Sequence, residues 1–244
     1  MIDPSPETGA AAERGGASWR HMGSVLTSPG EGFAALARKP TFALVMVLLV
    51  VVGAVGVWIA MSKVTAADLF ASIEQSGRAV PAKMQEDPEA FLKVMRATQL
   101  GTVIVLSPLF YLALAGICLV AFRMLGSDLT FRQSLATTVH ALLPFGLVGI
   151  AGIAIAFGRD EIRLADIQAG GLVPSHLGVL AGEDAGKVLR ALLGSFDLFS
   201  VWCVVLLATG YRVVARVSRG AAWGVVGTVW TIGILIKLAI AAIF

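Results

Sequence analysis

Residues 195–244 read SFDLFSVWCVVLLATGYRVVARVSRGAAWGVVGTVWTIGILIKLAIAAIF, and this stretch decides the expected fold. It contains most of two apolar segments, 194–214 and 221–244, which are joined by a short turn that carries Arg216 and Arg219. At about 1.5 Å per residue, each segment can cross about 30 Å of hydrocarbon. The stretch therefore predicts a hairpin of two membrane-spanning helices.

The composition of the whole chain is typical of a polytopic membrane protein. Apolar residues make up 57% of the chain and charged residues 14%, and the mean hydropathy is +0.84. Ordinary soluble domains have about 25% charged residues. Apolar runs of about twenty residues occur at 41–61, 99–122, 134–157, 194–214 and 221–244. We therefore expect an all-α fold with five transmembrane helices.

The segment before the first span divides into two parts. Residues 1–17 are rich in Ala, Gly, Pro and Glu without periodicity, which predicts a disordered tail. Residues 18–40 show helical spacing of apolar residues and predict cytoplasmic, amphipathic interfacial helices. Ser28, Pro29 and Glu31 match the pattern of a capping box at a helix start. The second helix is expected either to anchor at the membrane surface or to bind a partner, and the remaining residues, 41–244, form the membrane domain.

Two charged residues lie inside the expected spans of the terminal hairpin. Asp197 lies about one turn inside the first leg, and Lys237 lies about two turns inside the end of the second. An antiparallel hairpin brings them to similar depth, and pairing recovers much of the cost of burying each charge. The pair is interpreted either as a structural lock, with Lys237 alternatively reaching the interface, or as a gate, proton relay or ligand counter-ion.

The candidate intramembrane polar site is completed by His140 and Ser200. Pro108 and Pro144 are candidate kinks in the second and third spans, because proline removes a backbone hydrogen bond. These kinks are compatible with a cavity or with helix packing alone. Small and polar residues at helical spacing in the hairpin predict inward-packing faces: Gly194, Asp197, Ser200, Val201, Val204, Ala208 and Tyr211, and Trp223, Gly227, Trp230, Ile234, Lys237 and Ala241.

The connections between spans also carry information. Residues 66–76 and 87–97 are amphipathic and predict helices outside the membrane. The short connections and the N-terminal segment carry closely flanking bases, and three arginines without an acid, Arg212, Arg216 and Arg219, lie in the last turn and just before it. The positive-inside rule then predicts a cytoplasmic N-terminus and an external C-terminus in a bacterial inner membrane.

The sequence argues against several classes of function. It contains no recognisable nucleophile–histidine–acid set, metal-ligand spacing or phosphate-binding glycine loop, so we expect neither an enzyme nor a cofactor. The pI of 9.1 does not indicate nucleic-acid binding, because the bases are distributed by side of the membrane. Cys118 and Cys203 both fall inside spans and are expected to act as small apolar residues.

A family resemblance adds to this interpretation. The stretches FRQSLATTVHALLPF, which opens the third span, and SHLGVL, with the DLF-x-x-W run formed by Asp197, Leu198, Phe199 and Trp202, resemble the bacterial branch of the Yip1 family. The resemblance covers the chain from about Trp19 onward. Eukaryotic relatives act in vesicle traffic and contact prenylated GTPases and each other, which implies a membrane-organising or adaptor role.

Two function hypotheses follow. In the first, the chain is a non-enzymatic membrane scaffold or adaptor whose partners are the lipid bilayer and either further copies of itself or another membrane protein. In the second, it is a small oligomeric transporter or channel that uses Asp197 and Lys237. Five spans show no inverted repeat, so transport would require several copies.

Overall fold

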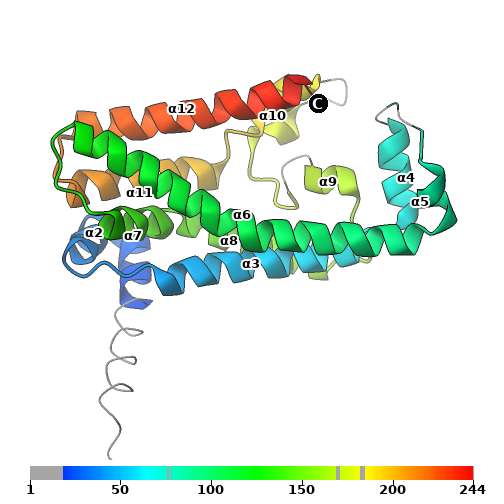
Figure 1. The fold of residues 1–244 in the computed structure, drawn as a ribbon, viewed down its shortest axis with the longest axis horizontal. Coiled ribbons are helices and arrows are strands. Elements are labelled where there is room, and N and C mark those ends of the chain that lie inside the picture. Colours follow the sequence, from blue (N-terminus) through cyan, green and yellow to red (C-terminus); the bar gives the residue numbers. More distant parts are fainter. Residues whose placement is uncertain (1–18, 76, 78, 169–170, 182–184, 244) are drawn as a thin grey trace, which may run out of the picture. The chain divides into compact units, whose positions relative to one another are not determined.

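A computed structural model describes residues 19–243, except for residues 76, 78, 169–170 and 182–184 (Figure 1). The expected tail, 1–17, lies outside the described residues. The regular elements of the described part are helices, and an isolated antiparallel bridge joins His176 to Asp197. The chain divides into two compact units: residues 1–49, 108–145 and 200–233 form the first, and residues 50–107, 146–199 and 234–244 form the second.

Four helices of the described part of the chain are long and apolar enough to cross a membrane. They are α3 (Ala43–Ser62), α6 (Pro88–Met124), the stretch Phe131–Phe157 and α12 (Arg219–Ile243). The remaining apolar helix, α11 (Leu198–Val214), has only 17 residues. The structure thus supports an all-helical membrane protein with four candidate spans.

Helix α6 is longer than the expected span 99–122. It begins at Pro88, where Asp87 Oδ1 accepts a hydrogen bond of 3.0 Å from the Ala90 amide. The expected surface helix over 87–97 is therefore the first part of α6, because nothing in the sequence interrupts the helix between the two segments. The other expected surface helix is α4 (Ala66–Gln75).

The core of the first unit gathers around Tyr211 of α11. Its side chain is completely buried, and its ring stacks on that of Phe122 at 4.7 Å between centroids. Two buried side chains of α2 (Pro29–Arg38), Phe33 and Leu36, belong to the same cluster. A Cβ atom on Gly210 would lie 2.8 Å from the Phe33 ring, so glycine is required for this close approach.

The apolar face of α2 therefore packs against the rest of the first unit. The sequence predicted an amphipathic helix whose apolar face is free for the membrane surface or for a partner. Figure 1 shows α2 beside α7 (Phe131–Ala141), and the two helices are in contact. Val25 of the helical segment 19–27 is also fully buried. Burial within the protein removes these apolar side chains from water, as contact with lipid would. An amphipathic sequence pattern is therefore the same for a helix packed in the protein and for one at the membrane surface.

The predicted capping box at Ser28 is absent. The Ser28 side chain makes no capping hydrogen bond, and the Glu31 amide bonds to the Ser28 carbonyl oxygen at 3.0 Å instead. Segment 19–27 ends directly before Ser28, so the Ser28 side chain cannot turn toward the amides in the first turn of α2. A complete capping box occurs at Thr130 and Gln133, at the start of α7.

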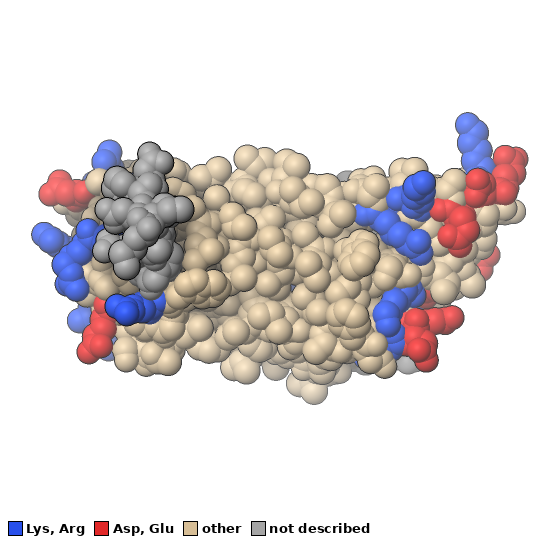
Figure 2. All heavy atoms as spheres, turned by 90° about the horizontal axis from the view of Figure 1, so that it is seen from below, with Lys and Arg blue, Asp and Glu red and all other residues tan. Residues whose placement is uncertain are grey.

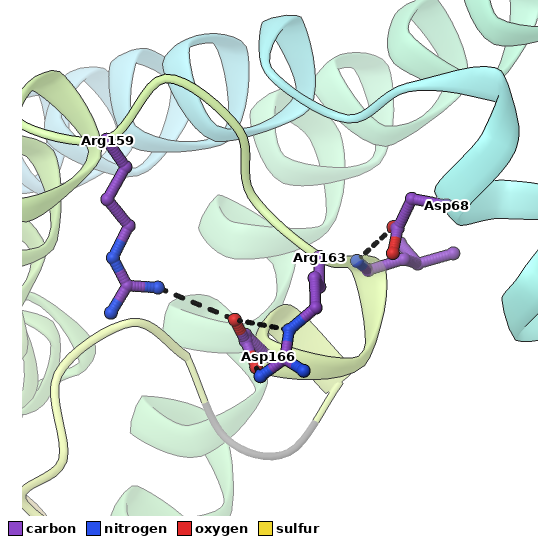
Figure 3. A network of polar contacts seen from close by, with 5 residues as sticks. Asp68, Arg159, Arg163 and Asp166 are labelled. Atoms are coloured by element: carbon purple, nitrogen blue, oxygen red, sulfur yellow. Dashed lines mark hydrogen bonds and ion pairs between the residues drawn. The ribbon is translucent and has the colours of Figure 1, made fainter.

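The second unit has polar contacts at the ends of its helices in addition to two apolar clusters. Arg96 of α6 donates from Nε to the Met61 carbonyl at 2.9 Å and from Nη2 to the Val64 carbonyl at 3.1 Å. Asp68 of α4 accepts a hydrogen bond from the Leu164 amide at 2.5 Å, at the start of α9 (Leu164–Gln168) (Figure 3). The same figure shows Asp166 between the guanidinium groups of Arg159 and Arg163, at 3.5 and 3.0 Å.

Charged residues are distributed unequally between the two units. The described part of the first unit has eight bases and two acids: Arg20, Arg38, Lys39, Arg123, Arg132, Arg212, Arg216, Arg219, Glu31 and Asp128. The second unit has bases and acids in similar proportion. On the face drawn in Figure 2, charged side chains gather in clusters, and wide areas without them are covered by the remaining residue types.

The predicted inward faces of the terminal hairpin are only partly right. On α11, Ala208 and Tyr211 are buried as expected, whereas Val201 is 45% exposed and the buried face includes Cys203 and Leu206 instead. A second correction concerns α12. Its buried residues are Ala222 and Val226, while Trp223 is 39% exposed and Lys237 is exposed. The spacing of small and polar residues therefore did not identify the buried faces, which contain small and large apolar side chains alike.

Candidate functional site

Asp197 lies directly before the first residue of α11, at the N-cap position. The sequence placed this residue one turn inside a span that begins at residue 194. The structure ends α10 (Lys187–Leu193) at Gly194 and starts the next helix only at Leu198. Aspartate is favoured at this position because its side chain can accept from the exposed amides of the first turn. Asp197 therefore marks the start of the apolar helix.

His176 is brought opposite Asp197 by the isolated antiparallel bridge. The flanking hydrogen bonds run from the Leu177 amide to the Phe196 carbonyl at 3.0 Å and from the Leu198 amide to the Ser175 carbonyl at 3.2 Å. The two bridged residues are thus a non-hydrogen-bonded pair, in which Cα atoms lie about 4.5 Å apart and the side chains project to the same side. An imidazole and a carboxylate are consequently neighbours.

The His176 ring is 92% buried against a glycine. A Cβ atom on Gly178 would lie 2.6 Å from His176 Nδ1, so a larger residue at 178 would displace the ring. Within the described residues, His176 Nδ1 has no hydrogen-bond partner. A buried ring nitrogen in this state is available to a proton or a polar ligand.

Lys237 reaches the same part of the second unit. Its Nζ lies 3.8 Å from the position that a Cβ atom on Gly194 would take, three residues before Asp197. Gly194 follows the last turn of α10, where the Gly194 amide donates a hydrogen bond of 2.9 Å to the Arg190 carbonyl. Backbone carbonyls at a helix C-terminus favour a nearby ammonium group. The predicted ion pair of Lys237 with Asp197 stays a prediction.

We call His176, Asp197 and Lys237 the bridge cluster. It combines an imidazole, a carboxylate and an ammonium group, which together can hold a proton or a polar headgroup. His176 was missed in the sequence because it lies in a Gly/Pro-rich connection, and a single bridge between residues 21 positions apart leaves no periodic pattern.

The other predicted site residues have different surroundings. His140 is completely buried in the first unit, where its Nδ1 donates to the Ala136 carbonyl at 2.9 Å. Ser200 lies in the first turn of α11. Helix α6 runs continuously through Pro108, whereas α7 ends at Ala141 and α8 (Leu143–Phe157) begins just before Pro144.

A buried hydroxyl network accompanies His140 in the first unit. Tyr211 Oη lies 2.8 Å from both Ser134 Oγ and Thr138 Oγ1, and Ser134 Oγ donates to the Ala115 carbonyl at 2.7 Å. This network links α6, α7 and α11 by hydrogen bonds that water cannot replace. Such interhelical hydrogen bonds stabilise helix association in a membrane.

The described residues contain no group of three or more His, Cys, Asp or Glu side chains that could hold a metal ion. Cys118 and Cys203 are both buried within hydrophobic clusters, as expected for small apolar residues.

Comparison with known proteins identifies relatives along nearly the whole chain. The model of the Yip1 domain matches residues 23–240, which confirms the resemblance seen in the sequence. Membrane protein YknW of Bacillus subtilis (strain 168) is 24% identical over 224 residues, and the match covers 88% of this chain and 87% of that protein. No solved structure matches the chain.

Proposed function

Because the chain belongs to the Yip1 domain family, we propose that it is a non-enzymatic membrane-organising scaffold or adaptor that uses helix α12 to bind another membrane protein or a second copy of itself. The family is one of membrane proteins, and the chain has several helices that can cross a membrane. A scaffold needs a surface that its own fold leaves uncovered. Helix α12 provides such a surface.

The observation that carries this proposal is a line of small residues on the exposed side of α12. Gly220, Gly224, Thr228 and Thr231 follow one another at helical spacing, and all four are exposed. We call these four residues the open α12 face. A Cβ atom on Gly220 or on Gly224 would meet no atom within 4 Å. The opposite side of the helix carries Ala222 and Val226, which are buried in the first unit.

Small residues matter because helices in lipid lack a hydrophobic drive toward one another. Their association depends on close packing and on hydrogen bonds from groups such as threonine hydroxyls. Glycines spaced by four residues let a second backbone approach closely, and the two threonines add hydroxyl groups on the same side. The open α12 face therefore fits another helix better than it fits lipid chains alone.

The proposal includes a topology of five spans with a cytoplasmic N-terminus in a bacterial inner membrane. Helix α11 is the fourth of these spans, and at about 1.5 Å per residue its 17 residues cover about 26 Å, slightly less than the hydrocarbon thickness. Its end at Val214 is followed by the basic turn of Arg216 and Arg219. The excess of bases in the first unit supports placing its charged connections in the cytoplasm.

The proposal is tested by co-isolation of two differently tagged copies, together with any other protein, in native lipid particles. Gly224→Leu fills the open α12 face, whereas Gly233→Leu adds the same side chain on the opposite side of the same helix, where a Cβ also meets nothing within 4 Å. We expect Gly224→Leu to abolish co-isolation and Gly233→Leu to preserve it. Equal behaviour of the two variants would refute the role of this face.

The second hypothesis, a small oligomeric transporter, is favoured by the bridge cluster. A bound metabolite or ion that is lost in Lys237→Met, without any protein partner in the particles, would support transport over a scaffold role. Retention of a protein partner in Lys237→Met is the result that the scaffold proposal expects.

A further inference from the structure

One ring nitrogen of His140 has no hydrogen-bond partner among the described residues. Its side chain is fully buried, and because Nδ1 donates to the Ala136 carbonyl at 2.9 Å, that nitrogen carries the proton. The lone pair of the neutral ring is then on Nε2, which has no hydrogen-bond partner within the described residues. Buried polar atoms without a hydrogen-bond partner are rare and indicate that a ligand, ion or water molecule binds there.

His21 lies next to this open nitrogen. The centroids of the two imidazole rings are 6.4 Å apart, and the ring planes meet at 66°. His21 Nδ1 lies 3.2 Å from Thr41 Oγ1, so the Nε2 atom of His21 is also left for a ligand. Met22 and Leu26 of the same helical segment pack against the cluster around Val139 and thereby hold His21 in place.

We propose that His21 and His140 form a two-histidine site for a divalent transition-metal ion of the Zn²⁺ class. With metal–nitrogen distances of about 2.0–2.1 Å, the ring centroids of two histidines lie about 5 Å apart on a tetrahedral ion and about 6.4 Å apart on a linear one. The observed separation of 6.4 Å equals the linear case, so a tetrahedral ion requires the half-buried His21 ring to move about 1 Å closer to His140.

The surroundings of both rings match those of metal-binding histidines. A histidine ligand usually donates its second ring N–H to a carbonyl or carboxylate, as His140 does to Ala136. The His21 ring is only partly buried, so a metal ion can reach its open nitrogen. Repulsion by the charge of Lys39 weakens the site, and two protein ligands leave the remaining coordination positions to water.

An ion at this site would tie segment 19–27 to α7. Because His21 and His140 come from segments more than a hundred residues apart, the ion would act as a cross-link within the first unit. Metal binding to the folded state alone stabilises that state by mass action. The inference does not depend on the scaffold proposal, since its residues are separate from the open α12 face.

The test measures Zn²⁺ binding to detergent-purified full-length protein that carries an affinity tag without histidine. The chain has three histidines, so His176→Gln is a matched control outside the site. Competition with a chromophoric chelator should give one ion per chain for the wild type and for His176→Gln. We expect about a tenfold or greater loss of affinity in His21→Gln and in His140→Gln, by analogy with the effect of losing a metal-site group.

A spectroscopic measurement keeps the proposal open to refutation if His140→Gln does not fold. Electron paramagnetic resonance of bound Cu²⁺ should report two nitrogen ligands in the wild type and one in His21→Gln, whose substitution lies at a half-buried position. Binding that is absent, or that is equal in the wild type and His21→Gln, would overturn the proposal. That result would mean that His140 Nε2 holds a buried water molecule instead.

Discussion

Removal of one hydroxyl group, by Tyr211→Phe, tests whether the buried network holds the first unit together. The phenylalanine ring can keep the stacking on Phe122 at 4.7 Å, so the substitution changes the hydrogen bonds with little change in packing. It removes the 2.8 Å contacts to Ser134 Oγ and Thr138 Oγ1, and the longer hydrogen bond of 3.3 Å to the Ser134 carbonyl. Ser134 keeps its bond to the Ala115 carbonyl, whereas Thr138 loses the contact with Tyr211.

The expected cost follows mainly from the loss of the two short hydroxyl contacts. Leaving a buried hydroxyl unsatisfied costs about 1–3 kcal/mol in soluble proteins, while single interhelical hydrogen bonds in membranes average about 0.6 kcal/mol. The loss of two contacts in Tyr211→Phe should therefore lower the free energy of unfolding by about 1–3 kcal/mol. Rotation of the Thr138 hydroxyl toward its own helix backbone would place the result near the lower limit.

The assay is reversible unfolding by SDS in mixed micelles, monitored by circular dichroism. Tyr111→Phe is the matched control, because it removes the hydroxyl of the other tyrosine, which lies outside this network. A double-mutant cycle with Thr138→Val should give a coupling energy of about 0.5–1.5 kcal/mol with Tyr211→Phe. Equal stability of Tyr211→Phe and Tyr111→Phe, or a coupling energy near zero, would refute the reasoning.

Two further substitutions test the packing and the capping of the first unit in the same unfolding assay. Gly210→Ala places a Cβ atom 2.8 Å from the Phe33 ring and should lower the free energy of unfolding by about 1–3 kcal/mol. The control, Gly116→Ala, adds a Cβ atom in open space within α6 and should not lower it. Equal effects of the two substitutions would contradict the close approach of α2. Thr130→Ala removes a capping box and should lower the free energy of unfolding by about 0.5–2 kcal/mol. Ser28→Ala should change it by no more than about 0.5 kcal/mol. A larger loss of stability in Ser28→Ala would mean that the cap predicted from the sequence does form.

The membrane fold was predictable because long apolar runs have few alternatives in lipid, where only helices satisfy the backbone of a spanning segment. The ends of the helices were harder to predict, because the residue patterns that mark a helix start were not equally reliable. Asp87 and Pro88 started α6 as their types predict, but the similar signal at Ser28 failed because the preceding helical segment ends there. Thr130 carried the real capping box without being singled out in the sequence.

The candidate site was less accessible to sequence reasoning. Asp197 was recognised as unusual, but its role at the start of α11 depends on where α10 ends, which hydropathy does not reveal. His176 became part of the cluster through a bridge in an irregular connection. The contact of His21 with His140 likewise required the docking of segment 19–27, since its apolar face would look the same if it lay on lipid.

The central claim is that the open α12 face binds a protein in the membrane, and photo-cross-linking in intact membranes tests it most directly. A photo-reactive amino acid at Thr228 lies on this face, and one at Ile236, which is 56% exposed, lies on another side of α12. We predict a discrete protein adduct from position 228, either a second copy of this chain or one other membrane protein, and only lipid adducts from position 236. Lipid adducts alone from both positions would contradict the account.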